Sequence, residues 1–392
     1  MTVVESWVSV PPGSPFPLTN LPYAATDAGV VVAIGDLALD AGAAARSSGS
    51  AYADVLAQPT LDGVLGLGRE GWTALRAEIT SWLTDPSQRQ AVEPHLVPQE
   101  DLELRLPFTV GDYVDFYASE QHATNLGRML RPGQPPLLPN WKHLPVGYHG
   151  RSGTVVVSGT AIPRPSGQQR GDDGPVFGPS RRLDIETEVG FVVGTPSRRG
   201  EPVPVDRFPE HVFGVCLVND WSARDIQAWE YQPLGPFLGK SFATSISPWV
   251  VPLDALASAR VWPASAHTAL LPYLREREAW GLDLRLEVRV NGELVSRPPY
   301  KFMHWSPAQM LAHLTVNGAS VRTGDLYASG TVSGPRRQEW GSLIELWDNE
   351  RFLDDGDEVV MTATAPGADA TTIGFGEVRG RILPARSSLD KE

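Results

Sequence analysis

Cysteine is nearly absent from this chain, which has a single such residue, Cys216, among 392. One thiol excludes an intrachain disulfide framework and fits a reducing compartment. Cys216 lies in the apolar run 212–218, so we interpret it as a core residue. A nucleophilic thiol is the less favoured alternative.

Long apolar runs and an excess of positive charge are missing as well. No stretch approaches the ~20 apolar residues needed to cross a bilayer, and the N-terminus lacks the basic and apolar regions of a secretory signal. The formal net charge is −13, which argues against nucleic acid or an anionic membrane as the main partner. We therefore expect a soluble, cytoplasmic protein that binds neither nucleic acid nor membranes.

Glycine and proline, in contrast, are plentiful, with 38 and 35 residues, and they predict many turns between short strands. Apolar periodicity predicts helices over about 69–84, 119–130 and 306–317, the last with capping-box spacing between Ser306 and Gln309. Alternating apolar residues and turn residues predict strands at 154–158, 183–193, 212–218, 282–290, 358–363 and 371–382.

A domain boundary is expected near residues 90–106. This segment is charged, carries Pro94 and Pro98, and follows the first predicted helix. The chain is long enough for two domains, so we expect them at 1–105 and 106–392. The residues suited to chemistry all lie in the second.

Residues 111–151 have the composition of a lined site. These 41 residues hold two aspartates, three tyrosines, three histidines and three arginines, but only two glutamates or lysines, the types that dominate solvated surface. Asp115 is a candidate metal ligand, and His122 can move a proton near neutral pH. Tyr117 and Arg131 can hold an anionic ligand. The set is suited to metal-assisted hydrolysis.

Three acidic residues alternate along the predicted strand 183–193. Asp184, Glu186 and Glu188 would share one face, with neighbours about 7 Å apart, which lets two carboxylates bind one ion. The solvated side of an antiparallel strand gives the same pattern. Unbalanced negative charge on one short strand favours a cation.

A further group follows the next apolar strand directly. If a helix starts at Asp220, then Asp220, Arg224, Gln227 and Tyr231 form one stripe, although a solvated helix face would look alike. The Pro/Gly-rich loop beyond it carries Lys240, whose apolar neighbours predict burial and a function.

The last candidate group lies between residues 328 and 346. Gly330 would let backbone amides approach a ligand closely. Glu345 has apolar neighbours on both sides, so we expect it to be partly buried and paired, with a histidine or alternatively with a structural arginine.

Together these segments closely resemble the fumarylacetoacetate hydrolase family over residues 112–384. The resemblance rests on long motifs in the same order, which are 115–117, 121–125, 138–141, 145–151, 219–227, 233–241 and 328–331. It implies cleavage of a carbon–carbon bond in a 1,3-diketo acid, giving fumarate and acetoacetate, the last step of tyrosine and phenylalanine breakdown.

The resemblance also implies how the metal is bound. It implies one Ca²⁺ or Mg²⁺ held by the carboxylates of Asp115, Glu186, Glu188 and Asp220, since hard cations take oxygen ligands. It implies a second Mg²⁺ near Asp220, Lys240 and Thr244, where Lys240 can ligate only through its backbone carbonyl. Asp184 matches no ligand role and is expected to support the site or face solvent.

The remaining roles are implied in the same way. His122 is the general base, oriented by Glu345. The oxyanion-stabilising group is Arg224, Gln227 and Lys240. The substrate-binding residues are Tyr117, Arg131, Gln227, Tyr231 and Thr331.

The implied fold is α+β and mostly β, with a small SH3-like barrel at 1–105 followed by a mixed β-roll at 106–392, assembled as a homodimer. Two alternatives stay open. An acylpyruvate hydrolase or related decarboxylase of the same superfamily is disfavoured by the N-terminal domain and by Tyr117, Arg131 and Tyr231. A non-catalytic metal-binding or ligand-binding homologue is disfavoured because a cation site needs neither His122 nor Glu345.

Overall fold

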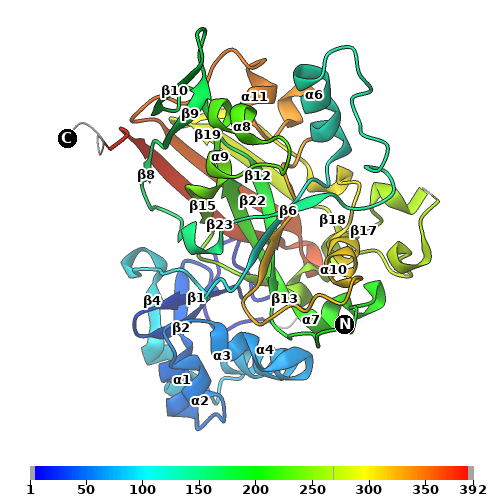
Figure 1. The fold of residues 1–392 in the computed structure, drawn as a ribbon. Coiled ribbons are helices and arrows are strands. Elements are labelled where there is room, and N and C mark those ends of the chain that lie inside the picture. The colour runs from blue at the N-terminus through cyan, green and yellow to red at the C-terminus, as the bar shows by residue number, and fades with distance from the viewer. Residues whose placement is uncertain (1–4, 268, 387–392) are drawn as a thin grey trace.

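An eight-stranded mixed sheet positions most of the site in the computed structural model, which describes residues 5–267 and 269–386 (Figure 1). The strand order is β6-β5-β21-β12-β13-β15-β7, and β16 pairs with β13. The strands are β5 (Tyr113–Phe116), β6 (Gly147–His149), β7 (Val155–Val157), β12 (Thr187–Val193), β13 (Val212–Asp220), β15 (Thr244–Ile246), β16 (Val251–Pro252) and β21 (Leu326–Ala328). Two pairs, β21 with β5 and β15 with β7, are parallel.

A five-stranded sheet packs against this one, with the order β20-β19-β22-β23-β8. Its strands are β8 (Ile162–Pro163), β19 (Arg285–Val290), β20 (Glu293–Ser296), β22 (Glu358–Pro366) and β23 (Thr372–Leu383). The predicted hairpin at Asn291 and Gly292 is confirmed, because both residues have positive φ and join β19 to β20. One core holds Phe191 and Leu217 of the first sheet together with Leu286 and Phe375 of the second.

The helices and strands of residues 23–98 form an N-terminal unit, drawn in blue to cyan at the lower left of Figure 1. Its strands make an antiparallel meander of β1 (Tyr23–Thr26), β2 (Gly29–Ile34), β3 (Leu37–Asp40) and β4 (Leu96–Pro98). Its helices are α1 (Ala41–Ser48), α2 (Ala53–Leu56), α3 (Asp62–Leu65), α4 (Gly68–Thr84) and α5 (Arg89–Val92). The whole chain is a mixed α+β fold with this unit at its N-terminus, which agrees with the predicted fold class.

The N-terminal unit shares a core with one face of the eight-stranded sheet. Trp72 of α4 and Tyr23 of β1 each place a ring 5.5 Å from the ring of Phe213 in β13. Cys216 and Val218 lie in the same cluster. Burial raises the pKa of the Cys216 thiol to about 12, so the interpretation of Cys216 as a core residue is confirmed.

The predicted long helices are present, and their ends follow local caps. Residues 69–84 lie in α4, and Ser119 caps α6 (Glu120–Leu130) by accepting from the backbone N–H of His122. The Ser306–Gln309 capping box begins α10 (Pro307–Thr315). The shorter helices are α7 (Phe208–His211), α8 (Arg224–Glu230), α9 (Leu238–Ser241) and α11 (Leu343–Leu346).

Three two-stranded ribbons complete the described strands. They pair β9 (Ser166–Arg170) with β10 (Pro175–Pro179), β11 (Leu183–Asp184) with β14 (Ser222–Ala223), and β17 (Arg260–Val261) with β18 (Gly281–Leu282). None of the helices in the described ranges is long and apolar enough to span a bilayer.

Candidate functional site

Four carboxylates converge at one end of the eight-stranded sheet. Asp115 is in β5, Glu188 is in β12 and Asp220 ends β13, while Glu186 lies just before β12. One oxygen from each carboxylate lies within 4.8 Å of the others, and all four residues are buried. The sequence prediction that these four acids meet is therefore borne out in their geometry.

Strand alternation explains why three of these side chains point the same way. Residues two apart on a strand share a face, so Asp115 shares its face with Tyr113, and Glu188 shares its face with Val192. Tyr113 and Val192 belong to the core beside the N-terminal unit. One face of the sheet therefore does two things. It packs apolar residues against the N-terminal unit at one end, and it carries these carboxylates at the opposite end.

Asp115 and Glu188 are short of partners. Oδ1 of Asp115 and both carboxylate oxygens of Glu188 are buried and accept no hydrogen bond within the described part of the chain. Burial, reinforced by the charges of the neighbouring acids, holds the pKa of each well above its ordinary value. Oxygen ligands that lack donors and repel one another fit a hard divalent cation.

Two buried cations border the acids. Nζ of Lys240 lies 2.6 Å from Oδ2 of Asp220 and 2.7 Å from Oε2 of Glu186, and Nη2 of Arg224 lies 2.7 Å from Oε1 of Glu186. Burial alone would raise the pKa of Glu186, but the charges of Lys240 and Arg224 hold it well below its ordinary value. Lys240 is buried, as predicted.

Asp184 supports this arrangement and does not face solvent. It is fully buried and pairs with Nε of Arg224 at 2.7 Å. It also accepts from the backbone N–H groups of Leu343 and Ile344, at 2.8 and 3.3 Å. Asp184 therefore fixes Arg224 relative to α11, the helix that carries Glu345, and of the two expectations for Asp184 the solvent-facing one is wrong.

His122 and Glu345 form a buried pair next to the acids. Nδ1 of His122 lies 2.7 Å from Oε2 of Glu345, and Nε2 lies 3.9 Å from Oε1 of Glu186. Of the two partners considered for Glu345, the structure has the histidine and not an arginine. The ring of Tyr117 meets that of His122 edge-on at 5.3 Å.

Glu345 is also held by three neutral donors. Asn125 donates to Oε1 at 2.8 Å, and the hydroxyls of Ser333 and Ser342 donate to Oε2 at 2.9 and 2.7 Å. Burial alone would raise the pKa of Glu345, but the charge of His122 and these hydrogen bonds hold it below its ordinary value. Glu345 is therefore ionised and fixed in place.

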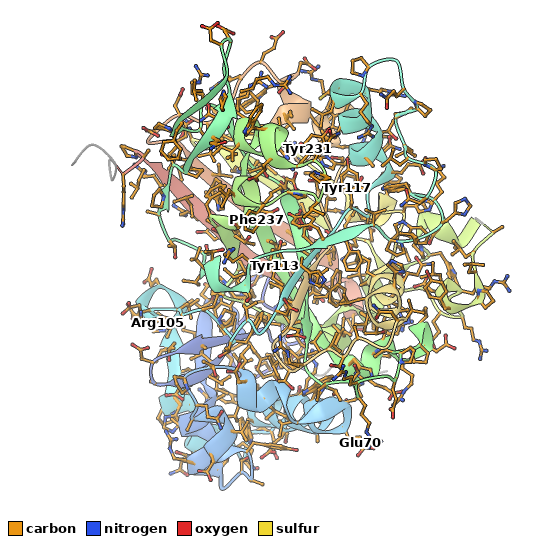
Figure 2. The ribbon with its side chains drawn as sticks, in the orientation of Figure 1. Glu70, Arg105, Tyr113, Tyr117, Tyr231 and Phe237 are labelled. Carbon is orange, nitrogen blue, oxygen red and sulfur yellow. The ribbon has the colours of Figure 1, made fainter. Side chains whose placement is uncertain are left out.

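The residues expected to hold substrate differ in burial and in hydrogen bonding. Thr331 is buried, and its hydroxyl oxygen makes no hydrogen bond within the described residues. Arg131 is half-buried and donates through Nη2 to the carbonyl of Pro136 at 2.8 Å. Tyr117, Tyr231 and Phe237 all lie in the larger part of the molecule, away from Glu70 (Figure 2).

Three polar residues near Arg224 and Asp220 make hydrogen bonds to other side chains. Gln227 accepts through Oε1 from Nη1 of Arg224 at 3.1 Å. Tyr231 lies just after α8 and accepts from Gln232 at 3.0 Å. Thr244 donates to Oδ1 of Asp220 at 3.2 Å. A ligand role for Lys240 or Thr244 toward a second ion stays a prediction.

One expectation about backbone is wrong, and another gains a packing reason. The helix expected to start at Asp220 starts at Arg224, because Asp220 completes β13 and β14 intervenes. Asp220 thus lies at the end of the preceding strand, as its place after the apolar run indicated, and shares no helical stripe with Arg224. Gly330 has φ of 73°, and a Cβ there would lie 2.1 Å from the carbonyl oxygen of Phe116. This contact with the end of β5 accounts for the glycine, while the approach of backbone amides to a ligand stays a prediction.

Tyr148 is a site residue to which the sequence analysis assigned no role. Its hydroxyl lies 2.8 Å from Oδ2 of Asp115 and 3.0 Å from Oδ2 of Asp220. Burial and these two charges hold the pKa of Tyr148 well above its ordinary value, so it remains a donor. Tyr148 pairs with Asp115 across β6 and β5, a register that the sequence does not reveal. Asn125, three residues after His122 on α6, could have been found from helical spacing.

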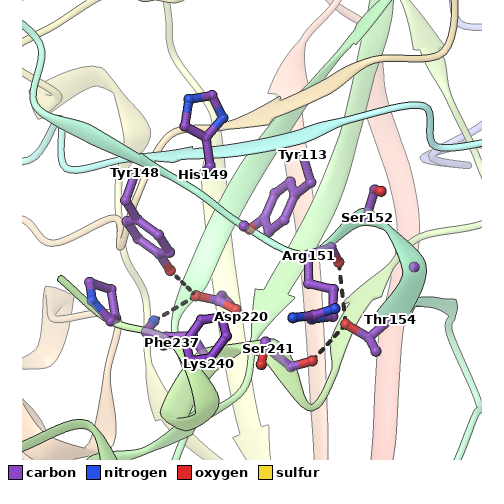
Figure 3. Close-up of a pocket in the computed structure, with 13 residues that line it drawn as sticks. Tyr113, Tyr148, His149, Arg151, Ser152, Thr154, Asp220, Phe237, Lys240 and Ser241 are labelled. Carbon is purple, nitrogen blue, oxygen red and sulfur yellow. Dashed lines mark hydrogen bonds and ion pairs between the residues drawn. The ribbon is translucent and has the colours of Figure 1, made fainter. Parts of the chain in front are cut away.

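A cavity of 530 Å³ opens beside the acids on the side of Asp220 and Lys240. Figure 3 shows these two residues with Tyr148 at one end and Arg151, Thr154 and Ser241 at the other. The site therefore has a route to solvent that does not pass His122, which is not among the lining residues.

Comparison with known families gives matches over most of the chain. A family model described as fumarylacetoacetate (FAA) hydrolase C-terminal matches residues 113–383. A second model, described as fumarylacetoacetase N-terminal, matches residues 19–107.

Relatives match over nearly their whole length. Fumarylacetoacetase of Homo sapiens is 44% identical over 97% of this chain and 99% of that protein. The Caenorhabditis elegans fumarylacetoacetase is 43% identical over 97% of this chain and 100% of that protein. Among solved structures, a putative HpcE protein from Mycobacterium smegmatis has a TM-score of 0.56 at 20% identity, covering 92% and 99% of the two chains. A fumarylacetoacetate hydrolase from Exiguobacterium antarcticum has a TM-score of 0.55 at 19% identity, covering 94% and 99%.

Proposed function

Because this chain belongs to the fumarylacetoacetate hydrolase family, we propose that it is an enzyme that hydrolyses fumarylacetoacetate to fumarate and acetoacetate. The observation that carries the proposal is the pairing of His122 with Glu345 beside four buried carboxylates. A binding protein would need the acids alone, whereas hydrolysis also needs a group that takes a proton from water.

The four acids Asp115, Glu186, Glu188 and Asp220 are proposed to hold one Mg²⁺ or Ca²⁺. Their fit rests on the oxygens of Asp115 and Glu188 that lack donors and on the raised pKa values of both groups. When bound, the cation would supply Lewis acidity toward a 1,3-diketone carbonyl. A second Mg²⁺ is proposed at Asp220, Thr244 and the backbone carbonyl of Lys240, supported by the contact of Thr244 with Asp220.

His122 is proposed to take the proton from the attacking water at Nε2. Glu345, which faces Nδ1 at 2.7 Å, would fix the tautomer and stabilise the imidazolium. Water then adds to the carbonyl of the fumaryl group, the bond from that carbon to the methylene between the two carbonyls breaks, and the proton is returned to the acetoacetate carbanion. The products are fumarate and acetoacetate, with one water consumed.

Arg224, Lys240 and Gln227 are proposed to stabilise the oxyanion formed by this addition. The charges of Asp220 and Glu186 keep the pKa of Lys240 above its ordinary value despite burial, so Lys240 remains a cation. Gln227 uses its carbonyl oxygen on Arg224, which leaves its amide N–H groups to donate. One such donor is typically worth about 3–4 kcal/mol in the transition state.

Tyr117, Arg131, Tyr231, Gln227 and Thr331 are proposed to hold the substrate. The free hydroxyl oxygen of buried Thr331 and the buried Nε of Arg131, which has no partner within the described residues, support this role. We also propose that the enzyme acts in the cytoplasm as a homodimer, and that residues 1–105 and 106–392 are its two domains.

The test is steady-state hydrolysis of fumarylacetoacetate, followed by loss of its ultraviolet absorbance and by identification of both products. An acylpyruvate serves as the competing substrate, because the related short hydrolases act on that class. We expect kcat/KM to be higher for fumarylacetoacetate. A higher value for the acylpyruvate would replace the proposed activity with acylpyruvate hydrolysis.

A further inference from the structure

The cavity beside Asp220 contains an arginine to which the proposed reaction gives no role. Arg151 follows β6 and lines the cavity together with Tyr148, Phe237 and Lys240. Its side chain is exposed, and no carboxylate of residues 5–267 or 269–386 lies within ion-pair distance of it. The guanidinium lies over the ring of Phe237, 5.8 Å from the centroid. Arg151 is thus a cation available to a ligand.

The turn that carries Arg151 is fixed relative to Lys240. The hydroxyl of Thr154 donates to the carbonyl of Arg151 at 3.2 Å and to the carbonyl of Ser241 at 2.8 Å. Ser241 follows Lys240 in α9. In Figure 3 Thr154 bridges these two segments, and the Arg151 side chain lies beside Phe237. A ligand that reaches Lys240 through this cavity therefore meets a guanidinium held at its outer end.

Arg131 lies near Tyr117, in the part of the site that holds His122. Its positive charge opposes the rise that burial gives the pKa of Tyr117, whose ring meets that of His122. Neither Arg131 nor Tyr117 lines the cavity of Arg151. Arg131 and Arg151 therefore lie at different parts of the site, one by Tyr117 and the other by Lys240.

We propose that Arg151, with Phe237 beneath its guanidinium, binds the acetoacetyl carboxylate of the substrate, while Arg131 binds the fumaryl carboxylate. This inference rests on the proposed function, because the substrate has a carboxylate at each end and a diketone between them. With the diketone at the four acids, one end would extend toward Arg131 and the other into the cavity. A guanidinium suits a carboxylate because it donates two parallel hydrogen bonds.

The experiment compares two substrates that differ in one carboxylate. Fumarylacetone carries the fumaryl group and the diketone but ends in a methyl group where fumarylacetoacetate has its acetoacetyl carboxylate. For Arg151→Ala we expect kcat/KM to fall about 10-fold with fumarylacetoacetate, mainly through KM. With fumarylacetone we expect the change to stay within about 2-fold.

Three further variants make the result specific. Arg131→Ala should lower kcat/KM for both substrates, since both carry the fumaryl carboxylate. Arg151→Lys should recover part of the loss, and Arg198→Ala, at an exposed site away from the cavity, should match wild type. Equal losses on both substrates for Arg151→Ala, or none on either, would overturn the role of Arg151. Failure of wild type to cleave either substrate would instead overturn the proposed function.

Discussion

Glu188 and Glu345 are both fully buried, yet their neighbours shift their pKa values in opposite directions. Glu345 accepts from His122, Asn125, Ser333 and Ser342, so its carboxylate stays ionised. Glu188 accepts from no donor within the described residues, and burial together with nearby acids raises its pKa. The same side chain is thus held ionised in one position and left without donors in the other, where it could hold a cation, because local donors decide the charge.

Removing the imidazole should separate chemistry from metal binding. We expect His122→Ala to lose more than about 99% of kcat, since a general base typically contributes at least about 100-fold. Cation affinity should stay near that of wild type, because Nε2 of His122 is 3.9 Å from Glu186 and His122 is not one of the four acids. His143→Ala, at an exposed histidine, is the matched control. Residual kcat above about 1% would contradict the role of His122.

The limits of the sequence analysis are visible at single residues. Asp115, Glu186, Glu188 and Asp220 could be named because each stands in a distinct motif or strand pattern. Tyr148 stands in such a motif too, but its two contacts depend on the register of β6 with β5. Register comes from long-range pairing, which one sequence does not display.

At the scale of elements, the sequence predicted helix ends that depend on neighbouring residues. It did not predict strand ends that depend on pairing with distant segments. The Ser306–Gln309 capping box lies within four residues and was found. The strand expected over 183–193 is instead broken into β11 and β12, because β11 pairs with β14 while Glu186 bridges to Ser342. That break separates Asp184 from the four clustered acids.

The N-cap of α10 also carries a pH-sensitive contact. The hydroxyl of Ser306 donates to Glu276, and burial raises the pKa of Glu276 to about 7. The unfolded chain releases this proton near the ordinary pKa of 4.5, so stability contributed by the protonated form is lost as pH rises from there to about 7.

Thermal unfolding of Glu276→Gln tests this contact. The amide mimics the protonated acid. The Tm of the variant minus the Tm of wild type should therefore be larger at pH 8 than at pH 5. The measurement is Tm at both values for both proteins. A Tm difference that is the same at pH 5 and pH 8 would contradict the assignment.

At the scale of the molecule, the N-terminal unit and the sheet of the site stabilise each other. Tyr23 and Trp72 pack on Phe213, and backbone bonds of 2.9 and 2.8 Å join Tyr23 to Val250. The sheet face involved is the one that carries Asp115, Glu188 and Asp220 at its other end. The SH3-like barrel for this unit rests on the family resemblance alone, since the sequence of 1–105 has few motifs that fix its strands.

Truncation of the shared core should therefore affect the whole protein. Phe213→Ala removes both aromatic contacts and should lower the free energy of unfolding by about 3–5 kcal/mol, as for other large buried aromatics. Phe177→Ala, at a ring that is 60% exposed, should change it by no more than about 0.5 kcal/mol. Chemical denaturation measures both. Equal, small effects would show that the two units do not depend on each other.

The most direct test of the whole account is turnover of fumarylacetoacetate by the metal-free and the reloaded enzyme. The four buried carboxylates, bordered within the described residues by the cations Lys240 and Arg224, should repel one another without a divalent ion, so chelation should abolish turnover and lower Tm. Adding Mg²⁺ or Ca²⁺ should restore both in wild type, but not turnover in Asp220→Ala. If chelated, verified metal-free protein hydrolyses fumarylacetoacetate at the full rate, the four acids have no catalytic cation and the account is wrong.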